Sequence, residues 1–401
     1  MKRILMIAPS SYPVDGAESI VNIKLLKALS DSGKFEIDLI ARKRHWSNYV
    51  TASFESYGIN VKSLNVITVD NKINLKTIWG HFKALLLFGV VFKGAHWAVK
   101  VLPIVKRLIK ENRYDYVLTK NASSLLLGYY AKKHYGQKWI ATWNDPYPEK
   151  KYPEPYGRGY DAKENWYEKR IISIMNKWVD IHIFPSERLK NHMQHYLRVD
   201  EKKTCIIPHV VLPQYVSSQK VSDDKLRLIH SGNLKSPRNP ESFLKALKIF
   251  VDKHINPAIE FTILGVCDEY LSDKISELGL EEYVKFIPPV SYSESLNLLK
   301  DYHVAVIIEA DCKEGIFLPT KVSDFMQCKK QIFAVSPKVG VLNDLYKKGA
   351  VSYFGVCDDV NSIYATMEKI YSDYKDDVLN EKGDMNKSYA SEIIVNQYLS
   401  F

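Results

Sequence analysis

The order of the apolar segments constrains the fold of this chain most, because short strand-like runs alternate with helix-like ones. The run at 3–8 has the length of a buried strand, and the next segment carries Val21, Leu25 and Leu29 at helical spacing. A second strand-like run at 35–41 follows directly. This alternation is typical of a parallel sheet covered by helices.

The alternation occurs in two rounds. The first continues with strand-like runs at 116–119, 139–142 and 181–184, and the second has them at 227–231, 260–264, 284–287, 304–308, 332–335 and 351–354. A chain of 401 residues is long enough for two core-bearing domains. The sequence therefore predicts two doubly wound, Rossmann-like α/β domains, with a ligand cleft where the carboxyl ends of their sheets face each other.

The expected domain borders follow from the stretch between the two rounds, Pro208-His-Val-Val-Leu-Pro213 and the polar run to Asp224. We predict an N-terminal domain at 1–207, a linker at 208–225 and a C-terminal domain at 226–375. The segment 376–401 ends in apolar residues at helical spacing, so we expect a helix that packs back on the N-terminal domain.

Composition narrows the class of protein. With 46% apolar and 25% charged residues, the chain is neither disordered nor a collagen or coiled coil. The apolar run before Pro9 is too short for a signal peptide, and the five cysteines form no CxxC pair. We expect a cytoplasmic protein with free thiols. No histidine, cysteine and carboxylate set has metal-ligand spacing, so no metal site is predicted.

The charge of the chain is unevenly distributed. Residues 1–210 carry a net charge of +15 and residues 211–401 one of −5. The stretch 71–110 holds eight basic and no acidic residues among aromatic and leucine side chains. Its apolar run at 84–92 is too short for the ~20 residues that span a bilayer. We expect docking on an anionic membrane, at the inner face of the cytoplasmic membrane. The alternative is a core helix with only its lysines at the lipid.

The first strand-to-helix turn places Gly16 just before a helix start, where backbone N–H groups favour an anion or hydroxyl oxygens. Its alternative role is a tight turn. Because a full GxGxxG is absent, no dinucleotide cofactor is expected. After the strand at 139–142, Asp145 stands at the cleft side before Pro146 and Tyr147. A carboxylate there could act as a general base, or merely cap a turn.

The second domain repeats this arrangement in His230-Ser-Gly-Asn-Leu-Lys-Ser-Pro-Arg-Asn-Pro240. Gly232, Lys235 and Arg238 could bind a diphosphate, although a solvated basic loop would have the same composition. Downstream, Lys321 falls in the first turn of a helix, where a cation opposes the helix dipole and suits anion binding. Asp324, one turn on, could accept ribose hydroxyls.

Four segments in this order resemble family 4 glycosyltransferases of the GT-B fold: Ser-Tyr-Pro-x-x-Gly-Ala-Glu18, Trp139-Ile-Ala-Thr-Trp-Asn-Asp-Pro-Tyr147, His230-Ser-Gly-Asn-Leu234 and Leu318-Pro-Thr-Lys-Val-Ser-Asp-Phe325. The resemblance spans nearly the whole chain. It implies retaining, metal-independent transfer of a sugar from a nucleotide diphosphate sugar, with no separate cofactor. The donor would bind mainly to the second domain and the acceptor mainly to the first.

The resemblance also implies roles for individual residues. Asp145, Arg238 and Lys321 would be catalytic, and Gly16 and Tyr147 would lie on the acceptor side. The remaining donor-binding residues would be Gly232, Asn233, Lys235, Pro289, Glu314, Thr320 and Asp324. Two positions depart from the family pattern: Asn233 replaces an arginine after the glycine, and Ile316 stands where a first glutamate is usual, so that Glu314 would substitute for it.

The sequence thus predicts a transferase that moves a sugar to a hydroxyl of a lipid-linked glycan in bacterial surface polysaccharide synthesis. Its partners would be the donor, the acceptor and an anionic membrane surface. A GT-B-like sugar-nucleotide epimerase and a non-catalytic sugar-nucleotide-binding protein are the alternatives. Nucleic acid is not expected, because it would require cations along a groove.

Overall fold

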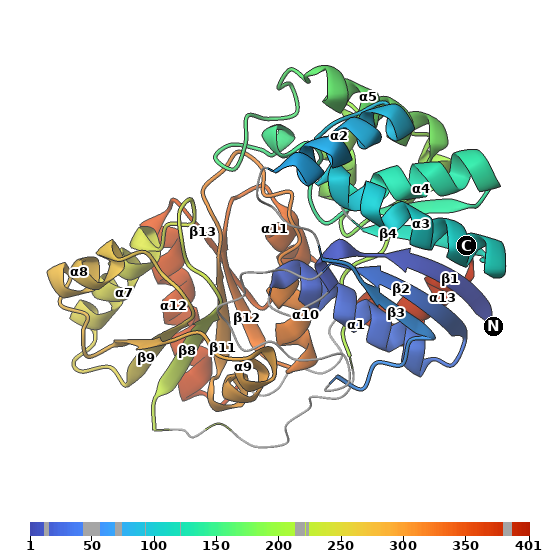
Figure 1. Ribbon diagram of the computed structural model, residues 1–401. Helices are drawn as coiled ribbons and strands as arrows, with labels where there is room; N and C mark the ends of the chain where they lie inside the picture. Colours follow the sequence, from blue (N-terminus) through green and yellow to red (C-terminus); the bar gives the residue numbers. More distant parts are fainter. Residues whose placement is uncertain are drawn as a thin grey trace. The chain divides into compact units, whose positions relative to one another are not determined.

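The computed structural model (Figure 1) describes residues 1–11, 16–42, 57–68, 74–92, 94–120, 122–212, 221, 224–379 and 387–401. The chain forms two compact units, and each is described by itself. The first comprises Met1–Tyr152, Arg158–Val210 and Ser391–Phe401. The second comprises Pro153–Gly157 and Val211–Ala390.

The first unit contains a parallel sheet in the order β3-β2-β1-β4-β5-β6-β7. Its strands are β1 (Lys2–Ile7), β2 (Phe35–Ala41), β3 (Ser63–Val66), β4 (Tyr116–Lys120), β5 (Trp139–Thr142), β6 (Ile181–Phe184) and β7 (Thr204–Ile206). Its helices are α1 (Ala17–Asp31), α2 (Leu75–Phe88), α3 (Ala95–Glu111), α4 (Ala122–Tyr135), α5 (Trp166–Trp178), α6 (Glu187–Gln194) and α13 (Ser391–Leu399). The strand order reverses between β1 and β4, the place where doubly wound sheets bind ligands.

The second unit has the parallel sheet β10-β9-β8-β11-β12-β13, which reverses between β8 and β11. Its strands are β8 (Leu226–Ser231), β9 (Ile259–Leu264), β10 (Val284–Ile287), β11 (Val304–Ile308), β12 (Gln331–Ser336) and β13 (Tyr353–Val356). Its helices are α7 (Glu241–Lys253), α8 (Tyr270–Glu277), α9 (Tyr292–Leu298), α10 (Thr320–Gln327), α11 (Val341–Lys347) and α12 (Val360–Lys375). The two doubly wound α/β layouts predicted from the sequence are confirmed.

The central strands are almost wholly buried, which is why their sequences are continuous apolar runs. Two edge strands, β3 and β7, escaped prediction because they are short and only partly buried. The prediction of a strand at 351–354 was wrong in its start. The N–H groups of Ala350 and Val351 donate to Leu345 O, closing helix α11, so β13 begins only at Tyr353.

The border between the units falls at Val210 and Val211, within the stretch predicted as a linker. Residues 213–220, 222 and 223 of that stretch lie outside the described residues. Helix α13 belongs to the first unit, where Ile394 and Tyr398 are buried. The Tyr116 hydroxyl donates to Tyr398 O at 3.1 Å and ties this helix to β4.

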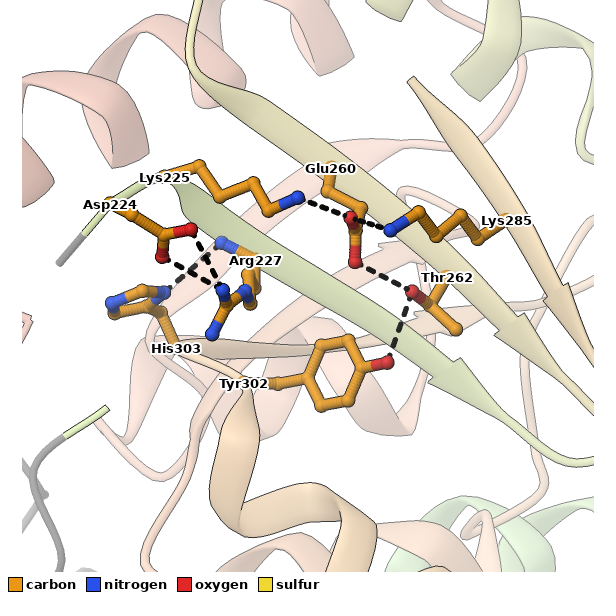
Figure 2. Close-up of polar contacts among 8 residues, drawn as sticks. All are labelled: Asp224, Lys225, Arg227, Glu260, Thr262, Lys285, Tyr302 and His303. Atoms are coloured by element: carbon orange, nitrogen blue, oxygen red, sulfur yellow. Dashed lines mark hydrogen bonds and ion pairs between the residues drawn. The ribbon is translucent and has the colours of Figure 1, made fainter. Parts of the chain in front are cut away.

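An ion-pair network occupies the amino-terminal edge of the second sheet (Figure 2). Glu260 on β9 accepts hydrogen bonds from Lys225 at 2.7 Å and pairs with Lys285 on β10 at 2.6 Å. Burial alone would raise the pKa of Glu260, but the hydrogen bonds from the two lysines outweigh it and lower the pKa. The network therefore joins three neighbouring strands at the edge opposite their carboxyl ends.

None of the helices in the described parts of the chain combines the length and apolarity needed to cross a membrane.

Candidate functional site

The carboxyl edge of the second sheet holds a cluster of polar residues around Lys321. This lysine lies in the first turn of α10, and its Nζ is 3.0 Å from Nε2 of His230 near the end of β8. Burial and the neighbouring cations Lys321 and Arg238 lower the pKa of His230 well below its ordinary value. The imidazole is therefore neutral at neutral pH and can accept a hydrogen bond from the ammonium group.

Position 232 requires a glycine. Its φ is +115°, and a Cβ there would lie 2.7 Å from Cε and 3.0 Å from Nζ of Lys321. The neighbouring Gly265, at φ +133°, would bring a Cβ within 2.8 Å of the Gly232 carbonyl. The two glycines thus let the strand ends and the lysine approach each other closely.

The charge balance of the cluster favours an anion. Burial, and then Arg238, lower the pKa of Lys321 to about 7, although Asp324 and Glu309 act in the opposite direction. A bound dianion would restore the protonated state, because opposite charge favours the charged form of a lysine. The structure thus brings together Lys321, Arg238 and Gly232, three of the residues predicted to bind the donor.

Glu309 is a member of this cluster that the sequence reasoning missed. It follows β11 directly, and Ser336 Oγ donates a hydrogen bond to its Oε2 at 2.7 Å. Burial raises the pKa of Glu309 despite the opposing effects of Ser336, Arg238 and Lys321. Its position after an apolar strand is the same signal that singled out Asp145, so it could have been found.

A short segment from the first half of the chain also belongs to the second unit. Within Pro153–Gly157, the ring of Tyr156 packs edge-on against Phe317 with centroids 5.4 Å apart. Burial raises the pKa of the Tyr156 hydroxyl, which is hydrogen-bonded to Arg238. Arg238 is therefore held by an aromatic residue far from it in sequence.

Other residues predicted to bind the donor lie around the cluster or apart from it. The Asp324 carboxylate is buried in α10 and accepts a hydrogen bond from the Tyr292 hydroxyl at 2.6 Å. Asn233 Oδ1 accepts one from the Val266 N–H at 3.3 Å, so it ties two loops together. Lys235 is exposed and lies near Cys267, and its carbonyl accepts a hydrogen bond from the Arg238 N–H at 3.0 Å.

The remaining three predicted donor residues occupy loops and a helix start. Thr320 is the first residue of α10, and its carbonyl accepts a hydrogen bond from Ser323. Glu314 is half-buried, whereas Ile316, the position of the usual glutamate, is fully buried. Pro289 is exposed in the loop after β10.

The carboxyl edge of the first sheet carries a second group of charges, at its own switch point. Asp145 follows β5, and its side chain is exposed. Protein atoms packed around the carboxyl group are the largest cause that raises its pKa, to about 6, and the neighbouring Glu18 and Glu149 act in the same direction. Lys120, the last residue of β4, is buried, and burial lowers its pKa to about 8 against the effect of Glu18. Lys120 and Glu18 were not predicted as site residues. In the sequence, only their positions at a strand end and at a helix start could have indicated them as site residues.

The two predicted acceptor-side residues differ in their surroundings. Gly16 is the N-cap of α1 at φ −156°, a conformation open to any residue, and its N–H donates to Ser19 Oγ at 2.9 Å. That N–H is therefore satisfied within the helix start. Tyr147 is partly buried, and burial raises the pKa of its hydroxyl.

A small cavity lies within the first unit beside this group. Its volume is about 20 Å³, room for about one water molecule. Polar side chains that line it include Lys120, Thr142, Asn144 and His209, and Tyr398 of α13 closes one side. The C-terminal helix thus lines the same cavity as Lys120 and Asn144.

The described residues contain one set of side chains with ligand atoms close enough for a metal ion. Asp311, Cys357 and Asp358 have these atoms within 4.8 Å of one another. Burial, followed by the two aspartates, raises the pKa of the Cys357 thiol to about 12. Asp311 and Asp358 are exposed, as acidic groups without a metal commonly are, and we assign no metal to this set.

Two Rossmann-like domains, each with its polar residues at the switch point, place the chain among GT-B type α/β proteins. Residues 77–214 match the model described as Glycosyltransferase Family 4, and residues 214–386 match that of Glycosyl transferases group 1. The matches are continuous along the chain. It therefore belongs to the family 4-type glycosyltransferases, as its sequence motifs suggested.

Solved structures with low sequence identity share this fold over the whole chain. Anabaena Alr3699/HepE in complex with UDP has a TM-score of 0.67 at 14% identity, covering 100% of this chain and 99% of that one. The lipopolysaccharide outer core galactosyltransferase WaaB gives 0.61 at 13% identity, covering 100% and 98%. A Listeria monocytogenes protein assigned as a UDP-N-acetylglucosamine 2-epimerase gives 0.58 at 12% identity, covering 99% and 94%. No curated protein is significantly similar in sequence.

Proposed function

We propose that this glycosyltransferase moves a sugar from a nucleotide diphosphate sugar to a hydroxyl of a lipid-linked glycan, with retention of anomeric configuration. The observation that carries the proposal is the placement of Lys321 across Gly232, in the first turn of α10 and with Arg238 nearby. Helix N–H groups and two cations suit a diphosphate. The complex of HepE with UDP, a protein of the same fold, supports this choice of ligand.

The charges of the second unit suit the chemistry of transfer. For retention, the acceptor oxygen forms its bond to the anomeric carbon on the face from which the diphosphate departs. The bond from that carbon to the diphosphate oxygen breaks, and the electron pair leaves with the diphosphate. The proton of the acceptor hydroxyl passes to a base, a role that we assign to Asp145. Arg238 and Lys321 would stabilise the charge that develops there. We propose that these side chains make a metal ion unnecessary, and activity that persists in a chelator would support this.

On the first unit, we assign the acceptor hydroxyl to Asp145, flanked by Gly16 and Tyr147. A carboxylate with a pKa near 6 is largely ionised at neutral pH and basic enough to take a proton in the transition state. We assign the nucleobase to the exposed loop after β10 that contains Pro289, where backbone groups can bind the edge of a base.

We further propose that the enzyme works in bacterial surface polysaccharide synthesis, at the inner face of the cytoplasmic membrane. The positive charge of residues 1–210 supports attraction to an anionic leaflet. The fold shared with the lipopolysaccharide outer core galactosyltransferase WaaB supports this proposal.

The test is a panel of nucleotide sugars with the purified full chain. We expect one of them to raise the unfolding temperature and to release its nucleoside diphosphate slowly. Arg238→Ala and Lys321→Ala should abolish both effects, whereas Lys245→Ala, which removes a half-exposed lysine of α7, should change neither. Interconversion of a free nucleotide sugar without transfer would instead identify an epimerase, and no response to any member would refute the donor site.

A further inference from the structure

Helix α2 (blue in Figure 1) exposes large apolar side chains along one face. We propose that this outward face inserts into the surface of an anionic membrane, with the helix lying flat and docking the first unit on the lipid. The outward face comprises Leu75, Ile78, Trp79, Phe82, Leu85 and Leu86. This inference rests on the proposed membrane-bound acceptor, and it names the element that would reach it.

The exposure is unusual for side chains of this kind. Leu75 is 85% exposed, Leu86 70% and Trp79 56%. Single exposed apolar residues are common, but these recur at helical spacing and form one continuous stripe. Trp79 and Phe82 stack with ring centroids 5.3 Å apart, so the aromatic part of the stripe is continuous too. Large exposed apolar patches mark binding surfaces.

The opposite face of the helix is built for packing. It carries Gly80 and Ala84, and a Cβ at Gly80 would lie 2.9 Å from Cβ of His96 on α3. Ala84 and Phe88 are buried, so this small-residue face fits closely against the unit. The orientation of α2 is therefore set by its contacts, and the bulky side chains are left outside.

The charge of the helix identifies the partner as an anionic surface. Lys76 and Lys83 are exposed, and they stand seven residues apart on one flank of the apolar stripe. No acidic residue occurs in α2. The Lys83 ammonium lies 5.5 Å from the centre of the Trp79 ring, so cation and aromatic residue would approach the same surface. Tryptophan, leucine and lysine in this arrangement are typical of helices at a lipid interface.

The exposed fractions test the interpretation of the apolar run in the basic stretch 71–110 as a core helix. Leu85, Leu86 and Leu87 are exposed, so the view of this run as a core helix was wrong for them. In α3, by contrast, Trp97 and Val101 are fully buried. Lys72 and Lys93 of the stretch lie outside the described residues. A helix of 14 residues is also about 21 Å long, too short to cross a ~30 Å hydrocarbon core.

The experiment measures sedimentation of the full chain with vesicles of phosphatidylcholine, with and without phosphatidylglycerol. We expect binding only to the anionic vesicles, weakening with salt. Replacing Trp79 and Leu86 by glutamine should weaken it about tenfold or more, as expected for lost apolar burial. Replacing Lys76 and Lys83 by glutamine should weaken it roughly fivefold per lysine at low salt.

Matched controls carry the same substitutions elsewhere. Trp166→Gln with Ile255→Gln changes residues that are 59% and 97% exposed, and Lys245→Gln with Lys248→Gln removes two lysines of α7. Neither control should affect vesicle binding. Absence of binding to anionic vesicles, or equal losses in variants and controls, would overturn the proposal.

Two further readouts separate the possible failures. Sedimentation velocity without lipid should show a monomer, and a dimer that dissociates on Trp79→Gln would assign the outward face to a second copy of the chain, overturning the proposal. Calorimetry with UDP, GDP, ADP and CDP in turn, without vesicles, tests the proposed donor site independently. Vesicle binding without nucleotide binding would refute the glycosyl-transfer site alone, and the reverse would refute the role of α2 alone.

Discussion

Substituting Gly232 by alanine tests whether donor binding needs the Lys321 ammonium at its present position, and not only the presence of a lysine at 321. The new methyl group would lie 2.7 Å from the lysine Cε and 3.0 Å from Nζ. These atoms form the end of a flexible side chain, so the clash is relieved by moving the ammonium and not by moving the backbone. The φ of +115° adds strain of about 1–3 kcal/mol to the folded state.

The expected loss of affinity follows from the displaced charge. A hydrogen bond to a charged group contributes about 1.5–3 kcal/mol, so Gly232→Ala should weaken binding of the nucleoside diphosphate that the panel identifies by roughly 10- to 150-fold. Calorimetry measures this directly. In a Lys321→Ala background the same change should cost little further affinity, because both substitutions remove one interaction.

Gly279→Ala is the matched control. Gly279 also has a positive φ, +64°, but a Cβ there would meet nothing within 4 Å. It should lower stability by about 1–2 kcal/mol and leave the affinity for this nucleoside diphosphate unchanged. If folded Gly232→Ala binds the nucleoside diphosphate as tightly as the unaltered protein, the close approach of Lys321 to the glycine has no part in donor binding.

Further expectations concern single charges. Asp145→Asn should reduce transfer about 100-fold or more while donor affinity stays the same, measured by product formation and calorimetry; an active variant would remove Asp145 from the mechanism. Because the pKa of Lys321 is lowered to about 7, affinity for a nucleotide sugar should fall as pH rises through that value, and Lys321→Arg should remove this dependence. Glu260→Gln should lower the free energy of unfolding in urea at neutral pH by about 1–2 kcal/mol, less than for a fully buried pair because Lys285 is 57% exposed. Because the pKa of Glu260 is lowered in the folded protein, this stabilisation is present above the ordinary pKa of 4.5 and is lost as pH falls through the folded value. The difference in unfolding free energy between the two proteins should therefore vanish in acid. A difference that stays constant with pH would contradict the assignment.

The elements that the sequence predicted well are those whose environment is uniform. A central parallel strand such as β4 is buried on both faces, so its apolar run is recognisable. The edge strand β3 has a partly exposed surface and a mixed sequence, and nothing local distinguishes it from a loop. The solvent exposure of the apolar face of α2 was not predicted for a different reason. An apolar stripe has the same helical period whether it faces the core or the solvent, and only the small face around Gly80 indicates which side packs.

In the candidate site, too, some features could be predicted from the local sequence and others could not. Lys321 was predictable because a cation at a helix start is electrostatically unfavourable without an anion. Its contact with His230 joins residues 91 positions apart and could not be read from spacing. The Tyr156 contact with Arg238 depends on a loop that joins the other unit, which no local pattern encodes.

The assignment of α13 to the first unit has a consequence for how the protein is made. The strands of that unit emerge from the ribosome first, yet the helix that buries Tyr398 against them is translated after the whole second unit. At ordinary rates of synthesis, roughly 10–40 s separate Val210 from the end of α13. During that interval α13 is not yet present to cover the surface around Tyr116. The unit whose synthesis begins first therefore completes its fold last.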